Sequence, residues 1–180
     1  IEDLVLSNMK SELILVDLSD NEIGSGTKQY IHEKGLLHRA FSVFIINGDK
    51  MLLQKRAYNK YHSGGLWTNA CCTHPRKAET IDEAVQRRLL DELGIECNTQ
   101  EIDSFIYYAD FQNIYEYECD HIFIGTYDGD IVPNPEEIDE LKWMKTADVE
   151  TDMRQSPNSY TKWFITAFPI VLNHLKDFRF

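Results

Sequence analysis

The sequence predicts an α+β fold in which helices cover both faces of a mixed β-sheet. Strand-like segments come first along the chain, one helical pattern occupies the middle, and further strands precede two helical segments. Elements in this order bury their apolar faces against one another in layers. We therefore predict one domain over residues 1–180, a length that suffices for a hydrophobic core.

The first half of the chain is expected to supply strands and a long loop. Residues 12–17 (ELILVD) predict a strand, and SDNEIGSG after them predicts a turn into a second short strand. The apolar runs at 40–46 and 50–56 flank Asn47-Gly48-Asp49, a strong signal for a β-hairpin. Residues 57–78 are rich in Gly, His, Asn and Pro, which predicts a loop.

A central helix is expected after this loop. Thr80 and Glu83 have the spacing of a capping box, and Gly94 is suited to end the helix. Between them, apolar residues recur at helical spacing: Ile81, Ala84, Val85, Leu89 and Leu93.

The second half of the chain predicts three strands and two helices. The strands are expected at 104–111, 118–127 and 140–145, and the helices at 146–153 and 159–178. Trp163, Ala167 and Val171 lie on one stripe of the last helix, and Pro169 should kink it.

Charge and composition exclude several classes of partner. A net charge of -12 and a pI of about 4.8 argue against nucleic acid and against anionic membrane surfaces. No apolar run reaches the ~18–20 residues that span a bilayer, so we expect no membrane insertion. The four cysteines do not have the spacing of a disulfide framework, which favours a reducing, cytoplasmic compartment. The acidic surface is compatible with a monomer.

Four segments are rich in metal-ligating residue types, and they hold His32 and His38, Cys72 and His74, Glu92, and Glu116 and Glu118. Residues two apart on a strand share a face, so Glu116 and Glu118 are expected to direct two carboxylates to one point. Imidazoles and carboxylates together suit Mn, Fe, Zn or Mg. Taken singly, each of these residues is more often structural, and Cys71-Cys72 lacks the second pair that a structural zinc site needs.

Cations lie beside these segments in an otherwise acidic chain: Lys28, Arg56, Lys60 and Arg88. Charge patterning alone favours solvated surface charges. The alternative is a clamp on a small diphosphate ligand, because Arg and Lys bind phosphate oxygens well. His62, His121 and His174 have no motif around them and are expected to be structural.

Residues 74–95 resemble the Nudix box, with matches at Glu79, Arg87, Leu89, Glu92, Gly94 and Ile95. Three positions depart from it. Thr73 replaces the leading Gly, Arg88 replaces a Glu, and Asp91 replaces the penultimate Glu. Because Arg88 interrupts the glutamate cluster that holds metals in Nudix hydrolases, hydrolysis of a diphosphate is less favoured.

The same departures resemble type 1 isopentenyl diphosphate isomerase, a family with a Nudix-type fold. The resemblance covers roughly residues 12–175. It rests, in order, on LHRAFSVFI, Lys-Arg-Ala at 55–57, GGLWTNACCTHP, RR-x3-ELG at 87–94, YEYEC and Trp163.

The resemblance implies a role for each matching residue. His32, His38, His74, Glu116 and Glu118 match the family's protein-bound metal site, which would take Mn2+, Zn2+ or Mg2+. Glu92 matches a carboxylate that helps to hold a second Mg2+ brought by the substrate. Cys72 and Glu118 match catalytic residues, and Tyr107 matches a helper of the glutamate. Lys28, Arg56, Lys60 and Arg88 match diphosphate contacts, and Trp163 matches the aromatic lining the isoprenoid pocket.

The implied reaction moves the double bond of isopentenyl diphosphate to give dimethylallyl diphosphate. An acid must protonate one carbon and a base must deprotonate another, so both should flank the allylic unit. We expect Glu118 to act as the acid and Cys72 as the base. A Nudix hydrolase of a nucleoside or other diphosphate is the main alternative. A non-enzymatic diphosphate sensor and a structural zinc protein are two further ones.

Overall fold

The computed structural model describes residues 12–177, which contain nine strands, four α-helices and one 3-10 helix. These residues fall into two compact units. Unit 1 takes in residues up to Phe41, Thr73–Val85 and Ser104–His121, and unit 2 takes in Ser42–Cys72, Gln86–Asp103 and Ile122 onward. The prediction of a single domain over 1–180 stays a prediction.

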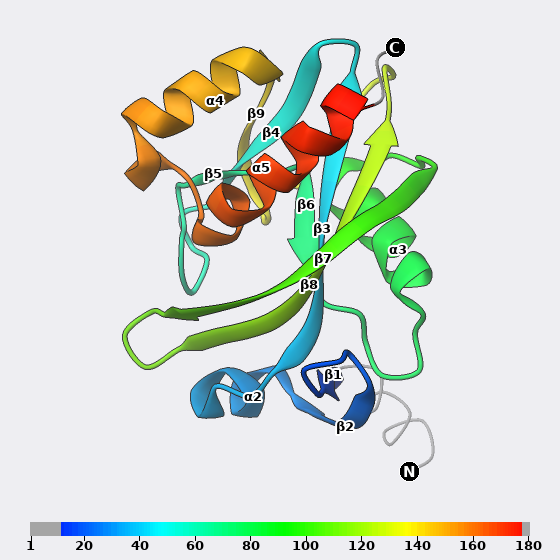
Figure 1. The fold of residues 1–180 in the computed structure, drawn as a ribbon, viewed down its shortest axis with the longest axis vertical. Coiled ribbons are helices and arrows are strands. Elements are labelled where there is room, and N and C mark those ends of the chain that lie inside the picture. The colour runs from blue at the N-terminus through cyan, green and yellow to red at the C-terminus, as the bar shows by residue number, and fades with distance from the viewer. Residues whose placement is uncertain (1–11, 178–180) are drawn as a thin grey trace. The chain divides into compact units, whose positions relative to one another are not determined.

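Unit 1 begins with an antiparallel pair, β1 (Glu12–Val16) and β2 (Glu22–Thr27), in which Ile14 faces Ser25. β2 continues directly into the helix α2 (Lys28–Lys34), which lies beside this pair of strands in Figure 1. Thr27 caps α2 by accepting a hydrogen bond from the Tyr30 amide at 3.3 Å. Gly35 ends the helix at φ +62°, a conformation that favours glycine.

Unit 1 also holds the adjoining ends of two long paired strands, β7 (Thr99–Asp110) and β8 (Tyr115–Thr126). Both are longer than the sequence predicted. Successive side chains of β8 point to opposite faces. On one of them Cys119 joins Ile14 and Val16 in a buried apolar cluster, against which Leu37 packs.

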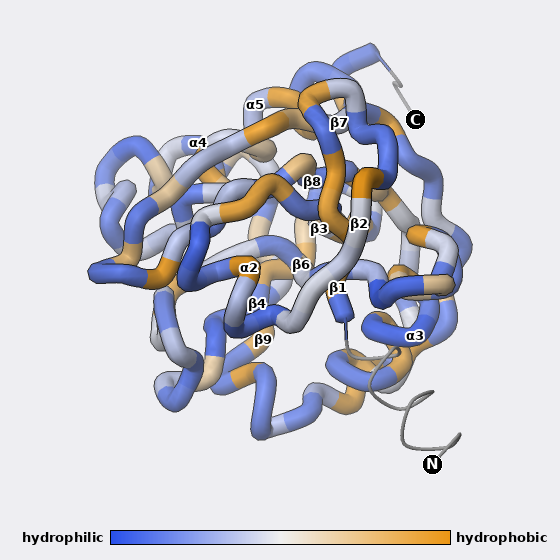
Figure 2. The backbone as a smooth tube through the Cα atoms, turned by 90° about the horizontal axis from the view of Figure 1, so that it is seen from below, coloured by the Kyte–Doolittle hydropathy of each residue, from blue (hydrophilic) through white to orange (hydrophobic). Residues whose placement is uncertain are grey.

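The predicted hairpin is confirmed between β3 (His38–Asn47) and β4 (Lys50–Arg56), where Asn47 pairs with Lys50. Gly48 has φ +59° in the tight turn, which explains the glycine. The apolar residues of β3 form an almost continuous buried run, visible by hydropathy in Figure 2. Within unit 2, β9 (Ile138–Lys145) pairs with β4 along its whole length.

The segment expected to be a loop at 57–78 contains two short strands, so that prediction was incomplete. These are β5 (Trp67–Thr68) and β6 (Cys71–Thr73). β5 pairs with β4 through Thr68 opposite Gln54. Asn69 lies between the strands and donates from its side chain to the carbonyls of Val43 and Cys71 at 3.1 and 2.7 Å. These bonds fix the backbone just before Cys72.

The central helix is confirmed as α3 (Ile81–Leu93). Its capping box forms as predicted, because the Glu83 amide donates to Thr80 Oγ1 and the Thr80 amide donates to the Glu83 carboxylate. Gly94 follows the helix at φ +65°. The helix thus carries Arg88 and Glu92, one turn apart, at fixed positions.

The chain continues through α4 (Thr146–Gln155), a 3-10 turn (Pro157–Ser159) and α5 (Lys162–Asp177). Phe164 on α5 stacks between Tyr160 and Phe44, with ring centroids 5.3 and 5.9 Å away. This aromatic contact anchors α5 inside unit 2 and places Trp163, its neighbour, in buried surroundings. Among the described residues, no helix is both long and apolar enough to cross a membrane.

Candidate active site

Three imidazoles and one carboxylate converge in unit 1. His32 comes from α2, His38 from the start of β3, His74 from the segment after β6 and Glu118 from β8. One ligand atom from each of the four lies within 4.8 Å of every other, and all four residues are buried. The ring centroids of His38 lie 4.9 Å from those of both His32 and His74. The structure therefore brings together four of the predicted metal ligands.

Backbone carbonyls orient two of these rings. His32 Nδ1 lies 2.7 Å from the Lys28 carbonyl oxygen, and His38 Nδ1 lies 2.9 Å from that of Leu36. A carbonyl only accepts, so each Nδ1 carries a proton and donates it to that hydrogen bond. Histidine ligands of metal ions are commonly held in this way. The donor set and its orientation thus fit a divalent metal ion.

Electrostatics in this cluster favour neutral His32 and His74 rings beside an ionised carboxylate. Burial lowers the pKa of His32 to about 4 and that of His74 to about 3. Burial alone would raise the pKa of Glu118, but the close contacts with His38 and His74 outweigh it and hold that pKa well below its usual value. His74 Nε2 lies 2.8 Å from Glu118 Oε1, and His38 Nε2 lies 3.4 Å from it. Neutral imidazole and carboxylate are the forms that bind metal.

Glu116, the fifth predicted ligand, is buried but lies outside this group of four. Its carboxylate accepts a short hydrogen bond from the hydroxyl of Tyr107 on β7. Burial and then the charges of Glu118 and Glu116 raise the pKa of Tyr107 well above its usual value, so it stays a neutral donor. Tyr108, the next residue on the strand, is exposed and points to the opposite face.

Unit 2 gathers two of the predicted diphosphate contacts around acidic groups. Arg88 Nε donates to Glu92 Oε1 at 3.1 Å, and its terminal nitrogen lies 3.4 Å from Glu137 Oε1. Lys60 donates a short hydrogen bond to the other oxygen of Glu137. Burial raises the pKa of Glu92 although Arg88 opposes this. For Glu137 the ion pairs with Lys60 and Arg88 outweigh burial and lower its pKa.

Arg56 and Trp163, also in unit 2, form a separate contact. The Arg56 guanidinium carbon lies 5.1 Å from the centroid of the Trp163 ring, within the range of a cation–π interaction. Trp163 is 3% exposed, and its indole Nε1 has no hydrogen-bond partner among the described residues. Lys28, the last predicted cation, is exposed at the start of α2 in unit 1.

The two adjacent cysteines have different surroundings. Cys71 is fully buried, and burial together with Glu92 raises its pKa well above the usual value. Cys72 is half-buried and takes part in no disulfide. A base must reach its substrate, so this difference favours Cys72 over Cys71 as the reactive thiol.

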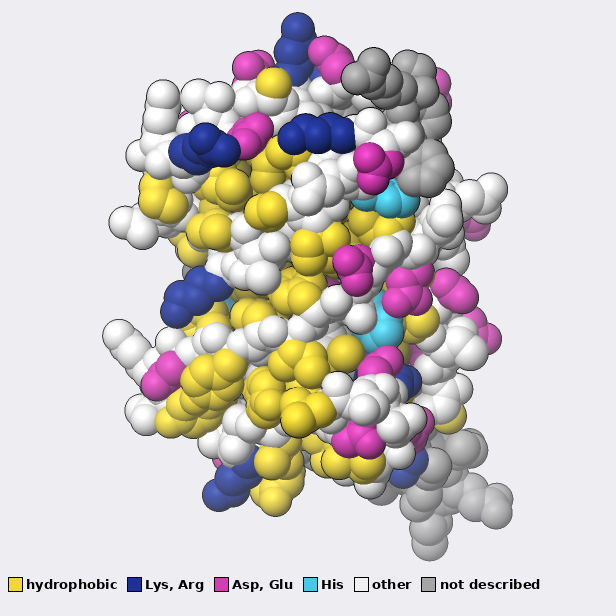
Figure 3. Space-filling view, in the orientation of Figure 1, with side chains coloured by type: hydrophobic (Ala, Val, Ile, Leu, Met, Phe, Trp, Pro, Cys, Tyr) yellow, Lys and Arg dark blue, Asp and Glu magenta, His cyan; other side chains and the backbone are white. Residues whose placement is uncertain are grey.

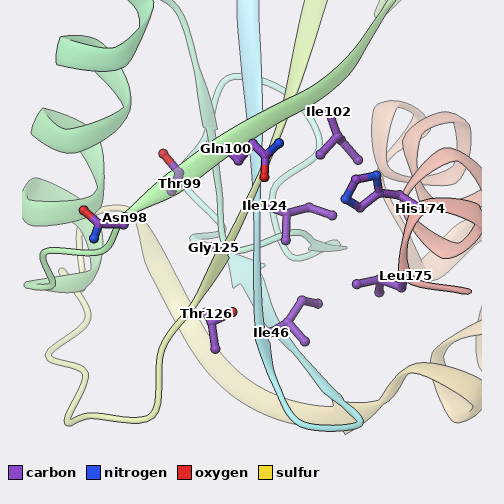
Figure 4. A pocket seen from close by; sticks show the side chains of 10 residues that line it. All are labelled: Ile46, Asn98, Thr99, Gln100, Ile102, Ile124, Gly125, Thr126, His174 and Leu175. Carbon is purple, nitrogen blue, oxygen red and sulfur yellow. The ribbon is translucent and has the colours of Figure 1, made fainter. Parts of the chain in front are cut away.

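A cavity of about 420 Å³ lies in unit 2 between β7, β8 and the end of α5. Figure 4 shows the mostly uncharged side chains around it, among them Ile46, Ile124, Thr99 and His174. None of the predicted site residues lines this cavity. The side chains that line this cavity include no cluster of cations or carboxylates, so the cavity does not suit a diphosphate.

Sequence reasoning missed Glu137, which contacts both Lys60 and Arg88. It lies 77 residues after Lys60 in a Pro- and Glu-rich segment that resembles an ordinary surface turn. Gln54, which donates to Glu92 at 3.4 Å and to the Ala70 carbonyl at 2.8 Å, was also missed. Neither residue belongs to a local motif, so only pairing across the fold reveals them.

Comparisons with known proteins agree with this fold. The family model of the NUDIX domain matches residues 36–164. A crystal structure from Deinococcus radiodurans superposes with a TM-score of 0.66 at 18% identity, covering 80% of this chain and 89% of the other. The fold class is therefore that of the NUDIX domain, with an α+β architecture, as predicted.

Relatives of known name identify one family within the NUDIX-domain class. "Isopentenyl-diphosphate Delta-isomerase 2" of Photorhabdus laumondii is 48% identical over 158 residues, which cover 87% of this chain and 89% of the relative. "Isopentenyl-diphosphate Delta-isomerase" of Serratia proteamaculans is 45% identical over 160 residues, covering 88% and 89%. The chain belongs to the isopentenyl-diphosphate Delta-isomerase family.

Proposed function

We propose that this chain interconverts isopentenyl diphosphate and dimethylallyl diphosphate by proton transfer through a tertiary carbocation. The observation that carries the proposal is the buried cluster of three imidazoles and Glu118 in a member of this family. The cluster supplies a carboxyl group whose acidity a metal ion would control. The activity of the family needs an acid of this kind.

We propose that His32, His38, His74, Glu116 and Glu118 hold one divalent ion, Mn2+, Zn2+ or Mg2+. When bound, the ion withdraws electron density from the Glu118 carboxyl group and makes it a stronger acid. The neutral rings and the ionised carboxylate support this assignment. Glu116 would join the set through its remaining lone pairs while Tyr107 holds the carboxylate.

Proton transfer is assigned to three side chains. Glu118, supported by Tyr107, would take up a proton from solvent before each turnover and deliver that proton to the terminal CH2 carbon of the alkene, so that positive charge develops at the tertiary carbon. Cys72 then takes a proton from the CH2 group on the other side, and its C–H electrons form the new double bond. The two transfers leave the atoms and charge of the substrate unchanged.

Recognition of the diphosphate is assigned to Lys28, Arg56, Lys60 and Arg88, with Mg2+ held by Glu92. Arg88 supports this role because two carboxylates already fix its guanidinium, which lowers the entropy lost on binding. The diphosphate is remote from the double bond that moves, so the binding energy of the diphosphate can hold the alkene in position for proton transfer.

Trp163 is assigned to the isoprenoid end of the substrate. A tertiary carbocation in water would be captured, so the reaction needs apolar, water-free surroundings. An indole face would also stabilise the cation, by about 0.5–2 kcal/mol when desolvated. The burial of Trp163 against Arg56 supports an apolar setting beside the cations.

The test is to incubate the protein and Mg2+ with isopentenyl diphosphate in deuterated water and to follow products by NMR. Deuterated dimethylallyl diphosphate is expected. Cys72→Ala should lower the rate at least ~100-fold, a typical contribution of one general base. Cys71→Ala, at the neighbouring buried cysteine, is the matched control and should retain the rate. Release of phosphate or pyrophosphate instead, with cleavage of a nucleoside diphosphate, would establish the hydrolase alternative.

The setting of the protein is part of the proposal. We propose a monomer in the cytoplasm, acting on a small isoprenoid diphosphate and not on nucleic acid. Four free cysteines support a reducing compartment. On the face drawn in Figure 3, Lys and Arg side chains of the described residues lie apart among acidic and apolar ones. Light scattering on a size-exclusion column would measure the oligomeric state.

A further inference from the structure

A second group of metal-ligating side chains lies in unit 1 apart from the histidine cluster. Asp20 in the β1–β2 turn, Cys119 and His121 on β8 each offer one ligand atom within 4.8 Å of the others. His121 Nε2 lies 2.9 Å from Asp20 Oδ2 and 4.0 Å from Cys119 Sγ. Cys119 and His121 are buried, while Asp20 is only half-buried, so an ion could enter past the carboxylate.

The geometry of this group fits a metal site and does not fit a nucleophilic triad. A Cys–His–Asp relay needs the thiol on one ring nitrogen and the carboxylate on the other. Here both the thiol and the carboxylate face the same nitrogen, Nε2 of His121. That nitrogen cannot accept from the thiol while donating to the carboxylate. Three donor atoms turned toward one point instead resemble the ligands of a cation.

The group is independent of the histidine cluster. Cys119 and His121 are an odd number of residues from Glu118 on β8, so their side chains project from the opposite face of the strand. Arg39 fixes the remaining part of Asp20 by donating to its Oδ1 at 2.9 Å and to its backbone oxygen at 2.7 Å. This leaves Oδ2 facing His121.

We propose that Asp20, Cys119 and His121 bind a second, thiophilic divalent cation such as Zn2+. Sulfur, imidazole and carboxylate ligands together select Zn2+ over Mg2+ or Ca2+. Binding releases the thiol proton to solvent and leaves a thiolate on the ion. Three protein ligands leave a fourth tetrahedral position for water.

Cobalt spectroscopy tests the proposal without using enzyme activity. Co2+ replaces Zn2+, and a thiolate ligand gives a near-ultraviolet charge-transfer band that nitrogen and oxygen ligands do not give. The histidine cluster contains no sulfur ligand, so Co2+ bound there does not give this absorption band. We expect the band to saturate at one equivalent of thiolate-bound cobalt in the metal-free protein titrated with Co2+.

Single-residue variants identify the cysteine that gives the cobalt charge-transfer band. Cys119→Ser should abolish it, and Cys97→Ser, at another buried cysteine, should keep it, as should Cys72→Ser. His121→Gln keeps the thiol and tests the site if Cys119→Ser disturbs the apolar cluster; cobalt affinity should fall roughly tenfold or more. Circular dichroism checks that each variant is folded. Absence of the band in the unmodified protein, or its loss in Cys72→Ser but not in Cys119→Ser, overturns the proposal.

Discussion

Two histidines of the candidate metal site are oriented by backbone carbonyls that belong to their own segments. His32 is held within α2 by Lys28, four residues earlier, and His38 is held by Leu36 at the entry to β3. Local contacts therefore set the directions of both rings. Such preorganisation lowers the entropy lost when a ligand binds.

Tyr107 offers a test of the support given to the carboxylates. Tyr107→Phe removes the hydroxyl that donates to Glu116. Because groups that orient metal ligands commonly contribute 10- to 100-fold, we expect metal affinity or turnover to fall by roughly that factor. Calorimetric metal titration and the NMR rate measure it. Tyr108→Phe, on the exposed face, is the matched control, and an equal effect there would contradict the assignment.

Arg88 offers a test of diphosphate recognition. Arg88→Lys keeps the charge but loses the planar fork that contacts Glu92 and Glu137. One charged hydrogen bond contributes about 1.5–3 kcal/mol, so KM for isopentenyl diphosphate should rise roughly tenfold or more. Steady-state kinetics measure this. Arg87→Lys, at the adjacent position, should leave KM nearly unchanged, and similar values for both variants would argue against a specific role.

At the scale of elements, local signals predicted what local interactions determine. The capping box of α3 and the Asn47-Gly48 hairpin were predicted because each depends on residues within a few positions of one another. The strands β5 and β6 were missed because two or three residues are too short to show periodicity. They form through pairing with distant strands, as Thr68 does with Gln54.

The start of α3 provides a stability prediction. Thr80→Ala removes a capping side chain that accepts from the Glu83 amide. The free energy of unfolding should fall by about 1 kcal/mol, within a range of about 0.5–2. Urea titration followed by circular dichroism measures it. Thr166→Ala is the control, because that exposed hydroxyl only contacts the Lys162 carbonyl within α5. A loss of stability as large in the control would rule out capping as the cause.

At the scale of the whole molecule, the candidate site residues within each unit come from distant parts of the sequence. The resemblance to a family indicated His32, His38, His74 and Glu118, which the structure brings together. It gave no indication of Glu137, which contacts both Lys60 and Arg88. A motif identifies residues by their neighbours in the sequence. The ion pair between Lys60 and Glu137 joins residues 77 positions apart, so only the folded chain reveals it.

Metal should stabilise the whole protein through the histidine cluster. An ion that binds only the folded state at 100 times its Kd adds about 2.7 kcal/mol to the free energy of unfolding. We expect Mn2+ to raise Tm of the chelator-treated protein. His74→Ala should remove most of this shift, and His174→Ala, at the cavity of unit 2, should keep it. Differential scanning calorimetry measures both, and an unchanged shift in His74→Ala would place the stabilising ion elsewhere.

β8 carries Glu116 and Glu118 on one face and Cys119 and His121 on the other. Shifting the pairing register of β8 by one residue would turn each set to the face of the other. Both sets would then be lost together, although no ligand had been substituted. Over evolutionary time this strand should therefore accept substitutions between its ligands, while changes in its length should be confined to the turn at 111–114.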